Sequence, residues 1–145
     1  MIKMKNYLLL LGGLLWGLAC QATSLKKIEI QSETGPISYQ IEVAQTQSQR
    51  EKGLMGRKNL PPHQGMIFLF PQKQVVNMWM KDTYIPLDML FIDDENRIIH
   101  LHEKALPLDK TIISSVFPVS KVLEINAQEI QKNKIKVGQK IFFTK

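Results

Sequence analysis

Alternating apolar and polar positions predict a chain built mainly of β-strands. Residues 27–31 and 37–44 alternate with a period of two, which places successive side chains on opposite faces of a strand. Glu33-Thr34-Gly35-Pro36 separates these runs and is typical of a hairpin turn. Further short apolar runs, separated by turn residues, predict strands at 66–70, 75–80, 88–92, 97–102, 121–126 and 140–144. Many short strands joined by turns favour an antiparallel β-sandwich or a partly closed barrel.

Two segments predict short helices at the edge of this β structure. In residues 46–56, Thr46 with Gln49 and Ser48 with Glu51 form overlapping capping-box patterns, and Gly56 is a suitable stop. Residues 128–133 predict one more helical turn. We therefore expect one or two short peripheral helices.

The first twenty residues have the pattern of a signal peptide. Lys3 and Lys5 precede thirteen residues without a charge, 7–19, whereas a helix that spans a membrane needs roughly 18 to 20 apolar residues. We predict a signal peptide at 1–20, a short polar linker at 21–27 and a single β-rich domain at 28–145. The protein is thus expected to be exported to the periplasm or cell envelope.

Cys20 leaves two alternatives for how the exported chain is processed. Gly17-Leu18-Ala19-Cys20 resembles a bacterial lipobox, in which the cysteine is lipidated, although Gly17 stands where Leu is usual. Lipidation would anchor the domain to a membrane. Ordinary cleavage after Ala19 or Ala22 is the other alternative. Because Cys20 is the only cysteine in the chain, no intramolecular disulfide can form.

The charge of the chain points to a solvated surface. The net charge is +6, and excluding the two lysines of the signal segment leaves 17 basic and 13 acidic residues. The basic residues are scattered and no aromatic residues interleave with them, as a nucleic-acid groove would require. We predict no nucleic-acid partner.

The stretch 77–93 is the place where the sequence indicates a site. It is almost wholly apolar but contains Trp79, Lys81 and Asp88, and a buried charge must be paired or used because isolation costs several kcal/mol. Asp88 shares a strand face with Leu90 and Ile92. It is therefore expected to form an ion pair with Lys81 or Arg57 or to accept loop N–H groups, or else to line a polar pocket.

Trp79 and Glu124 extend the candidate site. Trp79 with Lys81 forms either a platform for a sugar ring or planar anion, or Trp79 is a core residue. Glu124 could complete a carboxylate–cation cluster, so that Arg57, Lys81, Asp88 and Glu124 are expected to converge. Two carboxylates near a cation are also the minimum for acid–base hydrolysis.

Metal and cofactor chemistry are not predicted. His100 and His102 share a strand face, but no further ligands follow at a suitable spacing. Met55, Met66, Met78, Met80 and Met89 lie in apolar segments, where methionine fills the core, so we prefer that interpretation to a Cu(I) site. The chain has no nucleophile motif, phosphate-cradling glycine loop or paired-cysteine metal site.

Four motifs in order resemble one known family. They are Gly53-Leu54-Met55-Gly56-Arg57, Gly65-Met66-Ile67-Phe68, Trp79-Met80-Lys81-Asp82-Thr83 with Ile85-Pro86-Leu87-Asp88, and Leu123-Glu124-Ile125-Asn126-Ala127. Over residues 37–143 the chain resembles domain-of-unknown-function family 192, also called uncharacterised protein family 0127. The resemblance implies a small β-sandwich domain, often exported, with no agreed activity.

Three positions depart from the family pattern. Asp82 stands where Asn is usual, Met78 where an aromatic residue is usual, and Gln128 where Gly usually follows Ala127. The last departure argues against a tight turn after Ala127.

The sequence favours an exported, non-catalytic accessory or binding domain. Its ligand would be a small polar molecule or an envelope partner, and the ligand-binding candidates are Arg57, Trp79, Lys81, Asp88 and Glu124. The alternative is a small envelope hydrolase or lyase that uses Asp88 and Glu124. Whether the protein is an enzyme stays open at this point.

Overall fold

Residues 25–144 form a β-rich domain in the computed structural model, which describes this range. The predicted signal segment and Cys20 lie outside the described residues. Seven strands form one sheet in the order β6-β5-β8-β3-β2-β1-β9, in which only β2 and β3 run parallel. The strands of this sheet are β1 (Lys26–Ser32), β2 (Gly35–Ala44), β3 (Gln64–Gln74), β5 (Leu87–Ile92), β6 (Ile98–Ala105), β8 (Val119–Asn126) and β9 (Ile141–Thr144).

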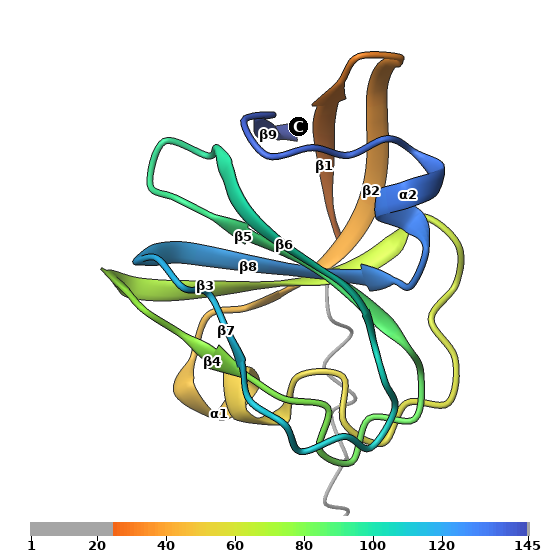
Figure 1. The fold of residues 1–145 in the computed structure, drawn as a ribbon, viewed down its shortest axis with the longest axis vertical. Helices are drawn as coiled ribbons and strands as arrows, with labels where there is room; N and C mark the ends of the chain where they lie inside the picture. Colours follow the sequence, from red (N-terminus) through yellow and green to blue (C-terminus); the bar gives the residue numbers. More distant parts are fainter. Residues whose placement is uncertain (1–24, 145) are drawn as a thin grey trace, which may run out of the picture.

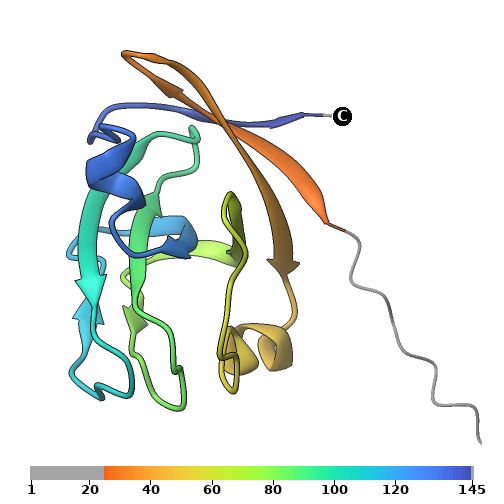
Figure 2. The same cartoon turned by 90° about the vertical axis from the view of Figure 1, so that its right-hand side faces the viewer.

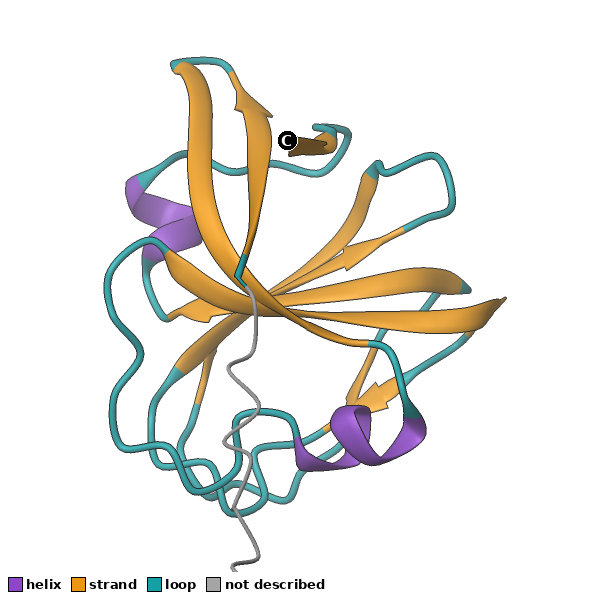
Figure 3. Ribbon diagram, turned by 180° about the vertical axis from the view of Figure 1, so that it is seen from behind, coloured by secondary structure: helices purple, strands orange, loops and turns teal. Residues whose placement is uncertain are grey.

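The remaining elements lie around this sheet. β4 (Asn77–Met78) and β7 (Ile113–Ser114) pair with each other as a second, two-stranded sheet. The helices are α1 (Gln47–Lys52) and α2 (Glu129–Lys132). Figure 1 shows α1, β4 and β7 on one side of β3, β5 and β8, and α2, β1 and β9 on the other. Figure 3 shows the two helices on opposite sides of the central strands.

The large sheet curls but does not close into a barrel. In the side view of Figure 2 the hairpin of β1 and β2 spans the top of the molecule, and α1 follows the lower end of β2. The segment before β9 connects back to the start of β6, because Gly138 N–H donates to the carbonyl of Ile98 at 2.8 Å. The predicted class, mainly β and sandwich-like with two short helices, is confirmed.

The strand alternation builds a separate core on each face of the sheet. On the side of α1, the buried cluster includes Met66, Phe68, Met89, Phe91 and Val122. The neighbouring positions Ile67, Leu90, Leu123 and Ile125 belong to the other cluster, together with residues of β1, β2, α2 and β9. Every residue of β5 is buried. Successive residues of a central strand point to opposite cores. The position of a buried polar residue along the strand therefore decides which core its side chain enters.

The capping residues of α1 form as the sequence predicts, but the helix is shorter. Thr46 accepts a hydrogen bond from Gln49 N–H at 3.2 Å, and the Gln49 side chain accepts from Thr46 N–H at 2.9 Å. The helix ends at Gly53, whose φ of 45° is a conformation that other residues rarely adopt. Gly56 is therefore not the stop.

Two strand predictions differ from the structure. The strand predicted at 66–70 runs through Pro71 to Gln74, with an irregular register against β8 after Leu69. The strand predicted at 75–80 is reduced to Asn77–Met78. The rest of that segment leaves the sheet, since Met80 N–H donates to the carbonyl of Asp109 on a distant loop.

The expectation about Gln128 is also wrong. The chain does turn after Ala127, and Gln128 adopts a left-handed conformation with φ of 74° at the start of α2. Glycine favours this conformation, so Gln128 holds it at a cost in backbone strain. Within residues 25–144 no helix has the length and apolar character needed to span a membrane.

Candidate functional site

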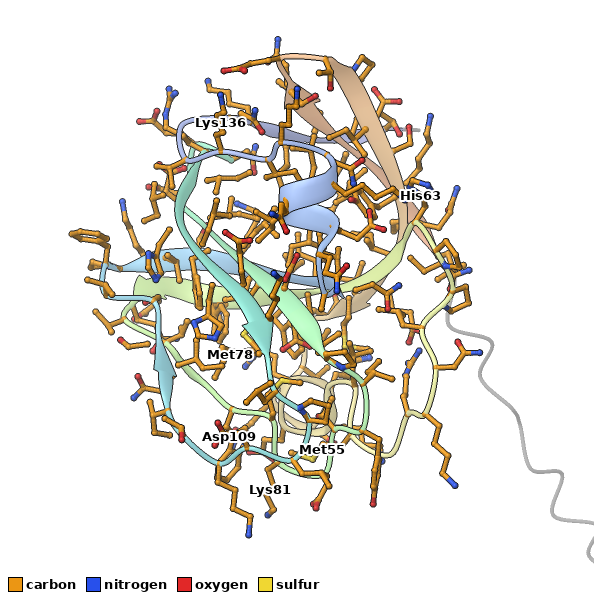
Figure 4. The ribbon with its side chains drawn as sticks, turned by 45° about the vertical axis from the view of Figure 1, so that its right-hand side comes forward. Met55, His63, Met78, Lys81, Asp109 and Lys136 are labelled. Atoms are coloured by element: carbon orange, nitrogen blue, oxygen red, sulfur yellow. The ribbon has the colours of Figure 1, made fainter. Side chains whose placement is uncertain are left out.

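A pocket of about 320 Å³ lies on the α1 side of the sheet. Its wall combines the end of α1, the middle of β3, the β4 segment, the following loop and one residue of β8. The lining residues are Arg50, Glu51, Lys52, Gly53, Leu54, Met55, Phe68, Phe70, Asn77, Met78, Trp79, Thr83 and Glu124. Figure 4 shows Met55 and Met78 on this side of the sheet, with Lys136 beyond the opposite side.

Glu124 is the buried charged group of this pocket. It pairs in register with Met66 on β3 and with Met89 on β5, and directly opposed residues project from the same face of a sheet. The side chain is therefore flanked by two thioethers, and only 4% of the residue is exposed. Burial raises the pKa of the Glu124 carboxyl group to about 8, with no opposing interaction.

No partner within residues 25–144 satisfies Glu124. None of the hydrogen bonds or ion pairs in that range involves its carboxyl group, and burial is the sole cause of its pKa shift. No fully buried side-chain oxygen of residues 25–144 lacks a partner, so the unpaired carboxyl oxygens of Glu124 are accessible from the pocket. A carboxyl group with a raised pKa that faces a pocket is typical of a functional site.

Aromatic and sulfur-containing side chains form the walls around this carboxyl group. Phe68 and Phe70 project from β3 on the same face as Met66, and Trp79, Met55 and Met78 complete the lining. Close approach of β3 and β8 depends on Gly65, because a Cβ there would collide with the backbone carbonyl of Glu124. The pocket wall is therefore mainly apolar, with Asn77 and Thr83 as its uncharged polar residues.

Trp79 belongs to the surface and not to the core. It is 44% exposed, and the Lys81 ammonium group lies 5.3 Å from the centre of its ring. Of the two alternatives for Trp79, the core residue is therefore wrong, and the contact of Lys81 with its ring is present. Lys81 itself does not line the pocket, and Figure 4 shows it at the outer end of the molecule, near Asp109.

The rim of the pocket is formed by charged residues of α1. The Arg50 guanidinium group donates to the carbonyls of Gln45 at 2.6 Å and Leu69 at 2.9 Å, and it lies 5.5 Å from the Phe70 ring centre. Glu51 accepts a hydrogen bond from the Gln47 amide. These contacts fix the Arg50 side chain at the mouth, away from the base of the pocket.

Asp88 is buried on the opposite face of the sheet. It pairs in register with Ile125, one position from the Met89–Glu124 pair, so its side chain points into the other core. There its carboxylate accepts hydrogen bonds from Lys104 N–H at 2.8 Å and Ile130 N–H at 2.9 Å. The prediction of a cationic partner is wrong. The carboxylate does accept N–H groups, but from the end of β6 and from α2 and not from a loop as expected.

Other polar residues surround Asp88 on that face. Tyr39 donates to Glu129 at 3.0 Å, and the Asn133 amide donates to the same carboxylate oxygen at 2.6 Å. Burial, followed by the charge of Glu129, raises the pKa of the Tyr39 hydroxyl. Each of these groups has a partner, as expected of a structural network.

Arg57 is also engaged elsewhere. Its guanidinium group makes a two-pronged ion pair with Glu42, with both N–O distances 2.6 Å. This pair lines a second hollow of about 290 Å³ on the other side of Gly53 and Met55. The expected convergence of Arg57, Lys81, Asp88 and Glu124 is therefore wrong: the four residues lie in four different environments.

Sequence reasoning missed most of the pocket wall. Phe68, Phe70, Met55 and Met78 were interpreted as core residues or were not considered, and nothing local distinguishes them from core residues. The useful signal was Glu124 itself, an acidic residue within the apolar run Val122–Ile125. Within the part of the chain that the structure describes, no three His, Cys, Asp or Glu residues are grouped so that they could hold a metal ion.

Comparison with known proteins identifies the family. The family model of DUF192, described as an uncharacterised ACR, matches residues 28–143. The chain belongs to the DUF192 family. No curated protein matches this DUF192 chain.

Two solved structures are similar to this DUF192 protein. One, from Sinorhizobium meliloti 1021 and described as a transcription regulator, is 38% identical with a TM-score of 0.81, covering 83% of this chain and 95% of its own. The other, a protein of unknown function from Novosphingobium aromaticivorans DSM 12444, is 32% identical with a TM-score of 0.79, covering 81% and 84%.

Proposed function

We propose that this DUF192 protein is a non-catalytic binding domain whose small ligand occupies the pocket between α1 and the sheet. The observation that carries the proposal is Glu124, a buried carboxyl group that faces the pocket without a partner from residues 25–144. Leaving such a group unpaired costs free energy of folding. A ligand that satisfies it would recover that free energy as binding.

The alternative of a two-carboxylate hydrolase or lyase has less support. Such a mechanism needs both carboxyl groups on one cleft, roughly 5 to 10 Å apart across the substrate. Asp88 and Glu124 project from opposite faces of the sheet, and the oxygens of Asp88 are already bonded to backbone N–H groups. A binding site, in contrast, requires only one carboxyl group in the pocket, and Glu124 provides it.

The relative described as a transcription regulator does not change this preference. The two helices of residues 25–144 contain six and four residues, whereas the helix-turn-helix motif presents a recognition helix to the major groove. We therefore keep a small molecule, and not a nucleic acid, as the proposed ligand. An envelope protein remains the second kind of partner, and it would be expected to cover the exposed face of Trp79.

We place the domain in the cell envelope, held by a lipid on Cys20. The support is the uncharged run 7–19, which ends in Leu18-Ala19 directly before Cys20. Metabolic labelling with a clickable fatty acid should mark the wild-type protein and not Cys20→Ala. Equal labelling of the two proteins would contradict lipidation, and secretion of unlabelled wild type would indicate simple cleavage.

The pocket proposal can be tested because Trp79 is the single tryptophan of residues 21–145. A panel of small amines, acids, alcohols and sugars should contain compounds that raise the melting temperature and shift the Trp79 emission. Met78→Trp, which would fill the pocket, and Glu124→Gln should both abolish the melting shift. Compounds that still act on both variants bind elsewhere, and a panel without any pocket binder would contradict the proposal.

A further inference from the structure

We propose that the ligand of this pocket is a small organic ammonium compound, with its cation on Glu124 and its apolar body against Phe68, Phe70 and Trp79. This inference rests on the proposed binding function and adds the chemical class of the ligand. It follows from the side chains that surround Glu124 and from the positions of the basic residues near the pocket.

None of the basic side chains near the pocket pairs with Glu124 within residues 25–144. Arg50 is held by two carbonyls and stacks on Phe70, and Arg57 is paired with Glu42. Lys52 reaches toward Gly56, where its nitrogen lies 3.9 Å from the position of a Cβ. Lys121 belongs to β8 as well, but its nitrogen donates to the carbonyl of Asp93.

The carboxyl group therefore has no counter-charge within residues 25–144, and a buried carboxylate needs one. A ligand that brings an ammonium group supplies the missing charge together with its hydrogen-bond donors. Charge-assisted bonds of this kind are about twice as strong as neutral ones.

The pocket walls also favour a cation over an anion. The faces of aromatic rings carry negative charge density, and a cation within about 6 Å of a ring centre is attracted to it. Lys81 already lies in this way on Trp79. The thioethers of Met55 and Met78 in the pocket wall present weak acceptors and no donors. An anion at the base would meet few groups that could stabilise it.

The charged groups that face the pocket are few. Glu124 comes from β8, and Arg50, Glu51 and Lys52 come from α1, whereas β3, β4 and the loop at Thr83 contribute none. The α1 charges lie at the rim, so they meet the far end of a ligand whose cation is at the base. The volume of about 320 Å³ is at the lower end of ligand pockets, which span about 300 to 1,000 Å³. The ligand is therefore small.

Three probes that share a 2-phenylethyl group separate the possible head groups. They are 2-phenylethylammonium, the neutral 2-phenylethanol and the anion 3-phenylpropanoate, each titrated into residues 21–145 by calorimetry and by Trp79 fluorescence. We expect the ammonium compound to bind at least about tenfold more tightly than the alcohol, which corresponds to one charge-assisted hydrogen bond. The anion should bind more weakly than both.

The pH dependence gives a second, independent readout. Glu124 must lose its proton to pair with the ammonium group, while alkylammonium groups themselves titrate near about 10. With the Glu124 pKa at about 8, affinity for the ammonium probe should rise about fiftyfold from pH 6 to pH 8, with release of about one proton per ligand at pH 7. Glu124→Gln should remove both the tight binding and the pH dependence.

Glu103→Gln is the matched control, because it makes the same charge change at an exposed position of β6 outside the pocket. It should leave the affinity and the pH profile unchanged. Tighter binding of the alcohol or the anion, lost in Glu124→Gln, would overturn the ammonium inference and retain the binding pocket. Failure of all three probes to bind wild type would overturn both.

Discussion

Asp88 and Glu124 make the sharpest comparison within this molecule. They lie on adjacent strands, one register position apart, and both are buried, with 0% and 4% of the residue exposed. Asp88 accepts two backbone hydrogen bonds in one core, whereas Glu124 faces a pocket in the other without a partner in the described chain. Burial alone therefore does not distinguish a structural carboxyl group from a candidate binding group. The presence or absence of hydrogen-bond donors beside the carboxyl group does distinguish them.

The two carboxyl groups should have opposite effects on stability. Asp88 connects β5 to the end of β6 and to the first turn of α2 through its two oxygens, so its hydrogen bonds support the fold. Glu124 is desolvated with no compensating bond, so its charge opposes folding. Substitutions that remove each charge should consequently move stability in opposite directions.

Asp88→Asn is expected to have the largest effect. The substitution replaces one accepting oxygen by an NH₂ group that faces a backbone N–H, and it weakens the other bond. We expect a loss of about 3 to 5 kcal/mol in the free energy of unfolding, which lowers the melting temperature by more than about ten degrees. Thermal and urea unfolding would measure it.

The control for this variant is Asp94→Asn, at an exposed ion pair with Lys73. It should change stability by less than about 1 kcal/mol. A melting temperature of Asp88→Asn within about two degrees of wild type would show that the backbone bonds of Asp88 are not structural, and the contrast with Glu124 would fail.

Glu124→Gln should stabilise the protein, and the gain should depend on pH. The pKa of Glu124 rises from 4.5 in the unfolded chain to about 8 in the fold, so the folded state binds more protons between these values. The stability of the wild type should therefore fall as pH rises through this window. We expect the variant to gain about 2 to 3 kcal/mol at pH 9, below the full linkage value because Glu124 borders a pocket and is not completely buried.

Unfolding of both proteins at pH 5, 7 and 9 would check this prediction. The difference between them should be small at pH 5 and should grow with pH. A constant difference would mean that Glu124 ionises in the fold as it does in the unfolded chain, and its lack of a partner would then carry no functional meaning.

Arg57→Ala should have an intermediate effect on stability. It tests whether Arg57 is independent of Asp88 and Glu124. Its ion pair with Glu42 is only partly buried, so we expect a loss of about 1 kcal/mol. The pH dependence of stability that we attribute to Glu124 should be unchanged in this variant. If Arg57→Ala instead shifted that pH profile, Arg57 would have to interact with Glu124, contrary to the geometry.

Gln128→Gly should produce the smallest change. Gln128 has a left-handed backbone two residues before Ile130, whose N–H binds Asp88. Glycine adopts this conformation without strain but is more flexible in the unfolded chain. We expect a gain of about 0.5 to 1 kcal/mol in unfolding free energy. A loss would show that the Gln128 side chain stabilises the turn in some other way.

The local features of the fold could be predicted because they depend on near neighbours in the sequence. Period-two alternation identified the hairpin of β1 and β2, and the Thr46–Gln49 capping box located the start of α1. The strand predicted at 75–80 is wrong because Val76 and Met80 join the core on the α1 side from outside the large sheet, whereas Val75 and Trp79 are exposed. Periodicity cannot distinguish this kind of burial from that of a strand. The helix predicted to reach Gly56 ended early, since Gly53 adopts a positive φ.

By itself, the sequence determined the strand periodicity, the family motifs and the presence of isolated charges in apolar runs, all of which are local properties. It also determined that Asp88 shares a face with Leu90 and that Glu124 shares a face with Val122. Only the tertiary structure decided that these two faces are opposite. The pairing of β5 with β8 joins residues far apart in the chain, and a shift of one residue would have placed both carboxyl groups on the same side. The same pairing decided which carboxyl group meets backbone N–H donors and which meets an open pocket.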